Sequence, residues 1–195
     1  TRAFALGGDT PSIQNQMQFV TIASEGNAID AGDLTEQSSG GQAFGSPTRG
    51  LLAGFASPMN ANIDFFNFAS TGDAQDFGTL STVSNSGDAL SSTTRGLVMG
   101  GSGSPNPYLS RIESITMATL GNGIDFGDLT AGRSMFGATS DCIRGVMIGG
   151  YISPGANTNV IDYVNIATFG DAVDFGDQVT TARNAGATST AHGGL

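Results

Sequence analysis

The stretch Ile161–Gln178, which reads IDYVNIATFGDAVDFGDQ, occurs four times in the chain in related forms. The other copies are IESITMATLGNGIDFGDL at Ile112–Leu129, IDFFNFASTGDAQDFGTL at Ile63–Leu80 and MQFVTIASEGNAIDAGDL at Met17–Leu34. One aspartate recurs at the same position of every copy, at Asp30, Asp76, Asp125 and Asp174. The spacing between these aspartates is 46, 49 and 49 residues. A period in this range is typical of repeat architectures such as propellers and solenoids.

A short apolar run closed by glycine precedes each copy. The four runs are TRAFALGG at Thr1–Gly8, TRGLLAGF at Thr48–Phe55, TRGLVMGG at Thr94–Gly101 and IRGVMIGG at Ile143–Gly150. Their length, their aliphatic content and the flanking glycines favour a buried strand. A pair of glycines allows a sharp exit from such a strand, because glycine readily adopts positive φ.

Each long copy contains two further strand patterns separated by a turn. Alternating apolar residues open the copy, and a Gly-Asn or Gly-Asp pair follows, as at Gly121-Asn122. These residues tolerate the backbone angles of hairpin turns, so the sequence predicts an antiparallel hairpin. A fourth strand of small residues comes next, as at Phe136–Ser140 and Gly186–Ser189. Four short strands in about 48 residues are the content of one propeller blade.

The order of these four elements resembles that of kelch repeats over nearly the whole chain. The Gly-Gly pair after an apolar strand is present at Gly7-Gly8, Gly100-Gly101 and Gly149-Gly150. The tryptophan of the outer kelch strand is missing, and its neighbourhood holds Phe77, Phe126, Phe175 and, in the first unit, Ala31. The usual tyrosine of the third strand is present only as Tyr163. The resemblance implies an all-β fold, a β-propeller or propeller segment built of four kelch-like four-stranded blades.

The variant I-x-x-I-x-I-A-T-x-G-x-A-x-D-F-G-D-L is similar to repeats of predicted tail-fibre and other virion proteins of marine phages, cyanophages among them. This similarity implies a virion protein of a tail fibre or appendage, and therefore an extracellular location. A surface built largely from Ser, Thr, Asn and Gly, as the charged fraction of 12% requires, is common on extracellular and virion proteins.

We expect a single repeat domain over residues 1–195, with units at about 1–47, 48–93, 94–142 and 143–190 and the stub of a further strand at 191–195. Two arrangements are compatible with these unit boundaries. The last small-residue strand completes the first blade and closes a four-bladed ring, which removes exposed sheet edges. Alternatively, the four units belong to a larger array or assemble with other chains.

The charge of the chain argues against several partners. Asp and Glu number 17 against seven basic residues, all of them Arg, and the pI is about 4.1. A nucleic-acid binder needs a basic surface, and so does a protein that binds anionic membranes. No apolar run approaches the length of a membrane span, so we expect no membrane insertion. The single cysteine, Cys142, excludes an internal disulfide framework and a multi-cysteine metal site.

Aspartates spaced by three residues form a weak candidate for calcium binding at Asp171, Asp174 and Asp177, with partial copies in the other units. The alternative is that these side chains accept hydrogen bonds from the backbone of their own turns or pair with arginine. One arginine per unit recurs at the start of the apolar strand, at Arg2, Arg49, Arg95 and Arg144. We expect each guanidinium to pair with a carboxylate of a DFGD segment, a structural role; the alternative is a ring of arginines that binds anions.

The four units differ most in the link after Gly-Gly. The links read DTPSIQNQ, ASPMNAN, SGSPNPYLS and YISPGANTN, and all contain proline. Divergent loops on a constant scaffold are a common way for β frameworks to carry recognition, and Tyr and Asn suit sugar or peptide ligands. The ligand-binding candidates are Tyr108, Tyr151, Asn60, Asn106 and Asn157. The alternative is that the links are unconstrained connections.

No catalytic constellation stands out, so we predict no enzymatic activity, no cofactor and no metal. His192 is the only histidine and lies near the end of the chain, where a triad is not expected. The leading hypothesis is a phage virion or tail-fibre module that binds a host cell-surface receptor or glycan through the links. The alternative is a structural building block that assembles with itself, as a homo-oligomer, or with neighbouring virion subunits. A third hypothesis, a glycan-cleaving enzyme, would need a pair of carboxylates in the links, and Asp9 is their only one.

Overall fold

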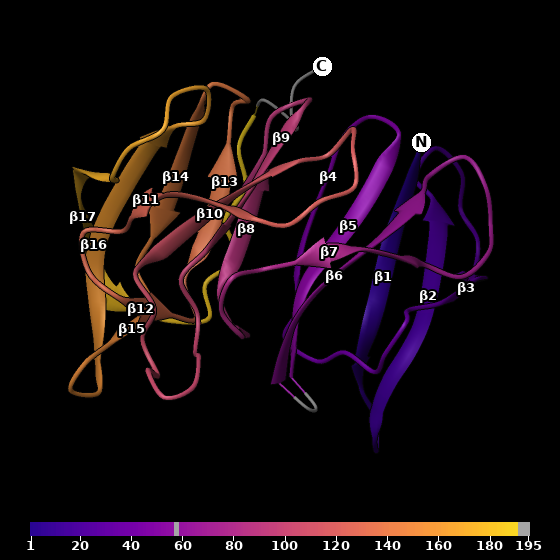
Figure 1. The fold of residues 1–195 in the computed structure, drawn as a ribbon, viewed down its shortest axis with the longest axis horizontal. Helices are drawn as coiled ribbons and strands as arrows, with labels where there is room; N and C mark the ends of the chain where they lie inside the picture. Colours follow the sequence, from indigo (N-terminus) through magenta and orange to yellow (C-terminus); the bar gives the residue numbers. More distant parts are fainter. Residues whose placement is uncertain (57–58, 191–195) are drawn as a thin grey trace.

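The computed structural model describes residues 1–56 and 59–190 (Figure 1). These residues form seventeen strands and no helix, so none of them belongs to a helix that could cross a membrane. The predicted all-β class is confirmed for this part of the chain. The predicted stub at 191–195 and His192 lie outside the described residues.

The strands form four antiparallel sheets, numbered here in chain order. Sheet 1 contains β1 (Arg2–Asp9), β2 (Ile13–Thr21) and β3 (Ile29–Asp33). Sheet 2 contains β4 (Gln42–Gly45), β5 (Arg49–Ala56), β6 (Met59–Asn67) and β7 (Gln75–Thr79). Sheet 3 contains β8 (Asp88–Ser91), β9 (Arg95–Met99), β10 (Arg111–Thr116) and β11 (Ile124–Asp128). Sheet 4 contains β13 (Gly137–Ser140), β14 (Arg144–Ile148), β16 (Ala156–Asn165) and β17 (Val173–Ala182), with the short strands β12 (Arg133–Ser134) and β15 (Tyr151–Ile152) at one end.

Each sheet is a meander of consecutive strands, and the predicted hairpins are its outer pairs β2–β3, β6–β7, β10–β11 and β16–β17. The small-residue strand at the end of one predicted unit pairs with the apolar strand of the next, as Gly137↔Ile148 shows for β13 and β14. The sheets are therefore offset from the predicted units. The strand predicted at Gly186–Ser189 is wrong for the described residues, because no apolar strand follows it there as a partner.

The sheets stack face to face in chain order, from sheet 1 (indigo) to sheet 4 (orange and yellow) in Figure 1. Three apolar clusters fill the spaces between consecutive sheets. Met17 and Phe19 of sheet 1 meet Leu52 and Phe66 of sheet 2 in the first cluster. The second cluster joins sheets 2 and 3, and the third joins sheets 3 and 4. Among the described residues, no apolar cluster joins sheet 4 to sheet 1.

Backbone hydrogen bonds join the outer edges of consecutive sheets. In sheets 2, 3 and 4 the glycine of the outer hairpin turn donates its N–H to the outer strand of the preceding sheet. The distances are 2.7 Å from Gly72 N to Ala31 O, 2.9 Å from Gly121 N to Phe77 O and 2.8 Å from Gly170 N to Phe126 O. Glycine is also required on the accepting strand. A Cβ atom on Gly127, whose φ is +148°, would lie 2.4 Å from Gly170 O.

A row of serine hydroxyls joins the inner strands. Ser91 Oγ donates to Gly45 O and Ser140 Oγ donates to Ser91 O, each at 2.8 Å. Ser189 Oγ continues the row by donating to Ser140 O at 2.7 Å. The segment 186–190 therefore lies against sheet 4 as an inner strand of a following sheet would, although it pairs with no strand in the described residues. Closure of a four-sheet ring by pairing of this segment with β1 is absent from this part of the chain.

Candidate functional site

Three of the four repeated arginines connect neighbouring sheets through backbone carbonyls. Arg2 Nη1 donates to Phe68 O at 3.0 Å, Arg49 Nη1 to Met117 O at 3.0 Å and Arg95 Nη1 to Ile166 O at 2.7 Å. Each guanidinium also lies over an aromatic ring, at 4.3 Å from the centroid for Arg2 over Phe19. The predicted pairing with DFGD carboxylates is therefore wrong for these three residues. A planar guanidinium suits this double task of stacking on a ring and donating to the next sheet.

Arg144 differs from the other three. Its guanidinium lies 4.7 Å from the centroid of Tyr163 in its own sheet. No sheet follows sheet 4 among the described residues, and within them no carbonyl takes the place of Ile166 O. A ring of four equivalent arginines around one anion is not formed in the described residues, since Arg2, Arg49 and Arg95 belong to the contacts between three different pairs of sheets.

Of the three aspartates of the weak calcium candidate, Asp171 lies in the turn before β17, and Asp174 and Asp177 lie on β17. Asp174 Oδ1 accepts a hydrogen bond from Gly176 N at 3.0 Å, and Asp30 and Asp76 make the same bond in their own units. Asp171 Oδ1 instead accepts from Asp128 N of sheet 3 at 3.0 Å. Residues 1–56 and 59–190 contain no group of three or more acidic, cysteine or histidine side chains placed to hold a metal ion.

A different set of carboxylates, which the sequence analysis passed over, is buried between the sheets. These are Asp64, Glu113 and Asp162, at the second position of three of the four long copies; the first copy has Gln18 there. Each accepts hydrogen bonds from a Thr or Ser of the preceding sheet's exit loop; Thr35, for example, donates its N–H and hydroxyl to Asp64 at 2.8 and 2.7 Å. The sequence signal that could have identified them is an acidic residue that recurs directly after the first isoleucine of the copy. These buried carboxylates therefore join consecutive sheets through hydrogen bonds.

The two candidate tyrosines of the links lie together, although they are 43 residues apart in sequence. Tyr108 comes from the link between β9 and β10, and Tyr151 is the first residue of β15. Their ring centroids are 6.0 Å apart in an edge-on arrangement. Arg183, which directly follows β17, places its guanidinium 4.5 Å from the centroid of Tyr151. We call Tyr108, Tyr151 and Arg183 the tyrosine cluster. Arg183 was not among the predicted site residues, because it does not occupy the position of the repeated arginines and no other unit has an arginine in its place.

Two of the three candidate asparagines neighbour the two tyrosines. Asn157 lies opposite Tyr151 in the β15–β16 pairing and is exposed. Asn106 Oδ1 accepts a hydrogen bond from Tyr108 N at 3.0 Å and so shapes the loop that carries Tyr108. Asn60 lies elsewhere, on β6, where its Nδ2 donates to Glu36 at 2.8 Å. The structure therefore separates Asn60 from the tyrosine cluster.

The links are shorter than predicted in three units. Strand β2 begins at Ile13, β6 at Met59 and β16 at Ala156, so most of each link is part of a hairpin. Ser57 and Pro58 of the second link lie outside the described residues. Only the third link, between β9 and β10, is long and irregular. In Figure 1, the β1–β2 turn and the β15–β16 turn lie at the lower edge of the stack.

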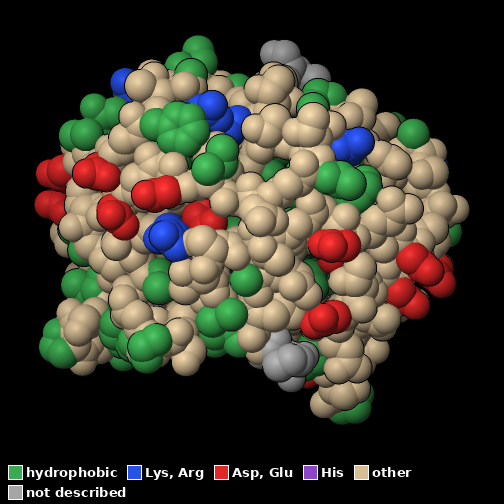
Figure 2. All heavy atoms as spheres, viewed as in Figure 1, with side chains coloured by type: hydrophobic (Ala, Val, Ile, Leu, Met, Phe, Trp, Pro, Cys, Tyr) green, Lys and Arg blue, Asp and Glu red, His purple; other side chains and the backbone are tan. Residues whose placement is uncertain are grey.

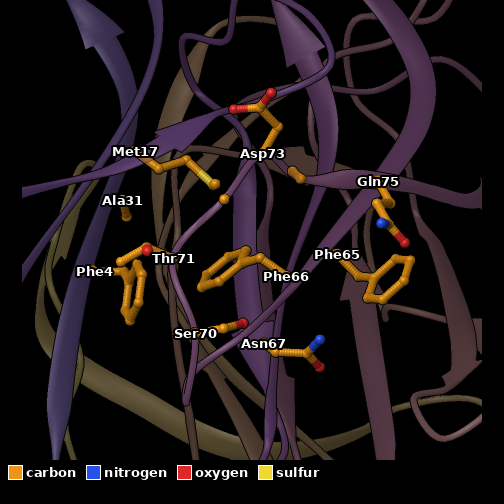
Figure 3. Close-up of a pocket in the computed structure, with 12 residues that line it drawn as sticks. Phe4, Met17, Ala31, Phe65, Phe66, Asn67, Ser70, Thr71, Asp73 and Gln75 are labelled. Atoms are coloured by element: carbon orange, nitrogen blue, oxygen red, sulfur yellow. The ribbon is translucent and has the colours of Figure 1, made fainter.

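A cleft of about 360 Å³ lies between sheets 1 and 2. Figure 3 shows the rings of Phe4 and Phe66 side by side, with Met17 and Asp73 above them. The cleft exists because Ala31 stands where sheets 2 and 3 have Phe77 and Phe126. Its floor is apolar, and its rim offers a carboxylate and hydroxyls. The replacement of Phe by Ala is visible in the sequence, but the space that it leaves is not.

The surface carries few charges, and most of them are acidic. Figure 2 shows a face made largely of uncharged polar and backbone atoms, with red acidic side chains more numerous than blue ones.

Burial raises the pKa of Asp88 above its ordinary value, although Ala89 N and Ala138 N donate to its carboxylate. Burial also raises the pKa of Asp64. Both groups lie between strands and are not part of the tyrosine cluster. Cys142 lies in the turn before β14 with a φ of +70° and is half-buried.

Searches against models of protein families and against curated proteins found no match to this chain.

Proposed function

We propose that this protein is a non-enzymatic recognition module of a phage virion or tail fibre, and that it binds a host cell-surface receptor or glycan through the tyrosine cluster. The proposal takes the four sheets as kelch-like blades of a propeller or of a propeller segment. Four-stranded antiparallel meanders that stack in chain order support that interpretation. The phage assignment depends on the repeat resemblance described above.

One observation carries the binding proposal. On a scaffold of paired strands, the Tyr151 ring lies 6.0 Å from the Tyr108 ring of a different link and 4.5 Å from the Arg183 guanidinium. Aromatic faces stack on the apolar faces of sugar rings, and a guanidinium donates several hydrogen bonds in a fixed plane. Arg183 also provides local positive charge on an acidic protein, which favours glycans that carry carboxylates.

An array of bacterial cell-surface glycans tests the proposal directly. We expect the wild-type protein to bind a subset of the array, and Tyr151→Ala or Arg183→Ala to abolish that binding. Asn60→Ala is the matched control, because Asn60 lies on a link outside the cluster, and it should bind as the wild type does. Loss of binding in the Asn60 variant alone, or no binding by the wild type, would contradict the proposal.

A second candidate function is that of a structural building block of a virion or extracellular fibre. The observation that favours it is the exposed apolar face of sheet 4, where Phe175 is 54% exposed. In that case Tyr108 and Tyr151 are expected to be covered by another chain in the assembled fibre. Labelling of tyrosines in the intact assembly separates the two functions, since receptor binding requires the cluster to be accessible.

A further inference from the structure

The two end sheets of the stack carry surfaces that are buried in the middle sheets. We call the face of a sheet that packs on the next sheet its trailing face, and the face that packs on the preceding sheet its leading face. The trailing face of sheet 4 consists of Val146, Ile148, Ile161, Tyr163 and Phe175. The leading face of sheet 1 consists of Ala5, Val20, Ile22 and Ala28. We propose that the trailing face of sheet 4 binds the leading face of sheet 1 of a second copy of this chain, head to tail.

Equivalent positions in the other sheets show that these two faces are built for burial. Phe175 is 54% exposed, whereas Phe77 and Phe126 at the same position are each 3% exposed. On the leading face, Ile22 is 65% exposed, whereas Met117 is 1% and Ile166 is 2% exposed. Val20 is 38% exposed, and its counterpart Ile115 is fully buried. Exposure of several large apolar side chains on one face is typical of an interaction surface.

Not every exposed apolar residue follows this rule, and the exception supplies a control. Val173 is 53% exposed, but its counterparts Ile29 and Ile124 are each 56% exposed. That position therefore faces solvent throughout the stack. Val173 and Phe175 lie two residues apart on the same strand, and only Phe175 occupies a position that the middle sheets bury.

The polar groups of the two faces are complementary as well. Between consecutive sheets, the turn Gly-Asp-Ala or Gly-Asn-Gly donates two backbone N–H groups to the outer strand, as Gly170 does to Phe126 O and Ala172 does to Asp128 O, both at 2.8 Å. Sheet 1 offers the same turn as Gly26, Asn27 and Ala28. Sheet 4 offers the carbonyls of Phe175 and Asp177 on the outer strand. A Cβ atom on Gly176 would meet nothing within 4 Å, so there is room for the incoming turn.

Arg144 and the segment 186–190 extend the match to the rest of the interface. By analogy with Arg95 and Ile166 O, Arg144 would donate to the carbonyl of Ile22 of the second copy. β1 pairs only with β2 in the described residues, whereas β5, β9 and β14 each pair on both edges. Ser189 already holds its segment in the inner-strand position. The register of β13 on β14 predicts that Ala187 lies opposite Ala5 of the second copy.

A junction of this kind is heterologous, so repeated junctions give a closed ring or an open filament. Two copies would bring together eight sheets. Both outcomes follow from the same two faces, and the mass of the assembly distinguishes them. The inference does not depend on ligand binding by the tyrosine cluster, because none of the cluster residues belongs to either face.

The test uses the 195-residue protein and four single variants, with mass measured by light scattering after size exclusion. The wild type is expected at a multiple of the chain mass. Phe175→Asp on the trailing face and Val20→Asp on the leading face should each raise the dissociation constant at least about a hundredfold, because each buries an unpaired charge. Val173→Asp and Ile29→Asp should leave the mass unchanged. An unchanged circular dichroism spectrum and a cooperative melting transition of the monomeric variants confirm that they are folded, although loss of association lowers their melting temperature.

Mixing the variants gives the decisive readout. Phe175→Asp retains an intact leading face, and Val20→Asp retains an intact trailing face, so their equimolar mixture should form a species of two chains that neither forms alone. A face that pairs with its own copy by two-fold symmetry would not be restored by mixing. A monomeric wild type, or a mixture that stays monomeric, overturns the proposal.

Cysteine cross-linking separates a second copy from closure within one chain. The variant Ala5→Cys/Ala187→Cys, made with Cys142→Ser, should form disulfide-linked chains on a non-reducing gel, because directly opposed residues on paired strands bring their Cβ atoms within reach. A disulfide within a single chain would show that segment 186–190 closes on its own β1, and would overturn the proposal. Each single-cysteine variant on the same Cys142→Ser background is the control, and it should give no more cross-linked product than the background alone.

Discussion

The guanidinium of Arg133 and the carboxylate of Asp162 form an ion pair from which water is excluded, with side chains 1% and 0% exposed. Arg133 also donates to Val160 O at 3.2 Å, and Asp162 also accepts from the Thr130 hydroxyl at 2.7 Å. Burial lowers the pKa of the Arg133 guanidinium, and the charge of Asp162 opposes this shift. Arg133 lies in the segment that follows the outer strand of sheet 3. The segments that follow the outer strands of sheets 1 and 2 have Ser38 and Ser84 at this position, so the charge pair occurs only where sheet 3 leads into sheet 4.

Removing one partner of this pair leaves the other charge buried and unpaired. We expect Arg133→Met to lower the free energy of unfolding by about 3–5 kcal/mol. The double variant Arg133→Met/Asp162→Leu should recover part of that loss, because it removes both charges. Urea unfolding of the two variants and of the exposed control Arg183→Met measures these differences. The explanation would be contradicted if the double variant lost more free energy of unfolding than its two single variants lose together.

The glycines of the outer strands provide a matched pair. Gly127 and Gly176 have φ values of +148° and +135°, so alanine at either site costs about 1–3 kcal/mol in backbone strain. Only at Gly127 does the added methyl also collide with the next sheet, which adds about 1–3 kcal/mol. We therefore expect Gly127→Ala to be clearly less stable than Gly176→Ala in urea unfolding. Both are compared on the Phe175→Asp background, where the proposed second copy is absent. Equal losses in free energy of unfolding would mean that the turn of the next sheet shifts at little cost to admit the methyl group.

The cleft at Ala31 predicts a stabilising substitution. Ala31→Phe restores the side chain that sheets 2 and 3 have at this position, and the ring is expected to fill the cleft beside Phe4, Met17 and Phe66. Filling such a space typically raises stability by about 0.5–2 kcal/mol. Thermal unfolding measures the change, with Ala23→Phe in an exposed turn as the control. A clear loss of stability would show that the cleft does not admit the ring.

Asp88 predicts a dependence of stability on pH. Burial raises the pKa of its carboxyl in the folded state, so the stability that this group contributes is complete below its ordinary pKa of 3.8 and is lost as pH rises through the raised value. Asp88→Asn removes this loss of stability at higher pH, because the amide does not ionise. We expect the stability of the variant relative to the wild type to improve as pH rises from about 3 to about 6. Urea titrations across this range measure it, with the exposed variant Asp9→Asn as the charge control. A relative stability that falls with rising pH would contradict the assignment.

The repeat made most of the strand order predictable. The 49-residue spacing and the turn glycines located the hairpins, and the class of the fold followed from them. The partners of the repeated arginines were not predictable, because backbone carbonyls leave no mark in the sequence. The acidic excess instead suggested carboxylates, and the structure has Arg95 on Ile166 O.

The candidate site was predictable only in part. Tyr108 and Tyr151 were found because they interrupt links that are otherwise small and polar. Their contact was not visible in sequence, since it depends on how sheet 3 and sheet 4 are stacked. Asn60 was chosen by the same reasoning and lies apart, because it belongs to sheet 2, whereas Tyr108 and Tyr151 belong to sheets 3 and 4. Arg183 follows the last strand, where no earlier unit has an arginine to mark the position.

The contact of each sheet with only its immediate neighbours has a consequence for how such a protein changes over evolutionary time. Duplication or loss of a whole 49-residue unit adds or removes one sheet and leaves every remaining junction chemically unchanged. A gain or loss of a single residue inside a strand has the opposite effect, because it turns the apolar side chains of that strand to the wrong face. The number of units in such an array is therefore free to vary among lineages, while the length of the unit is held nearly constant.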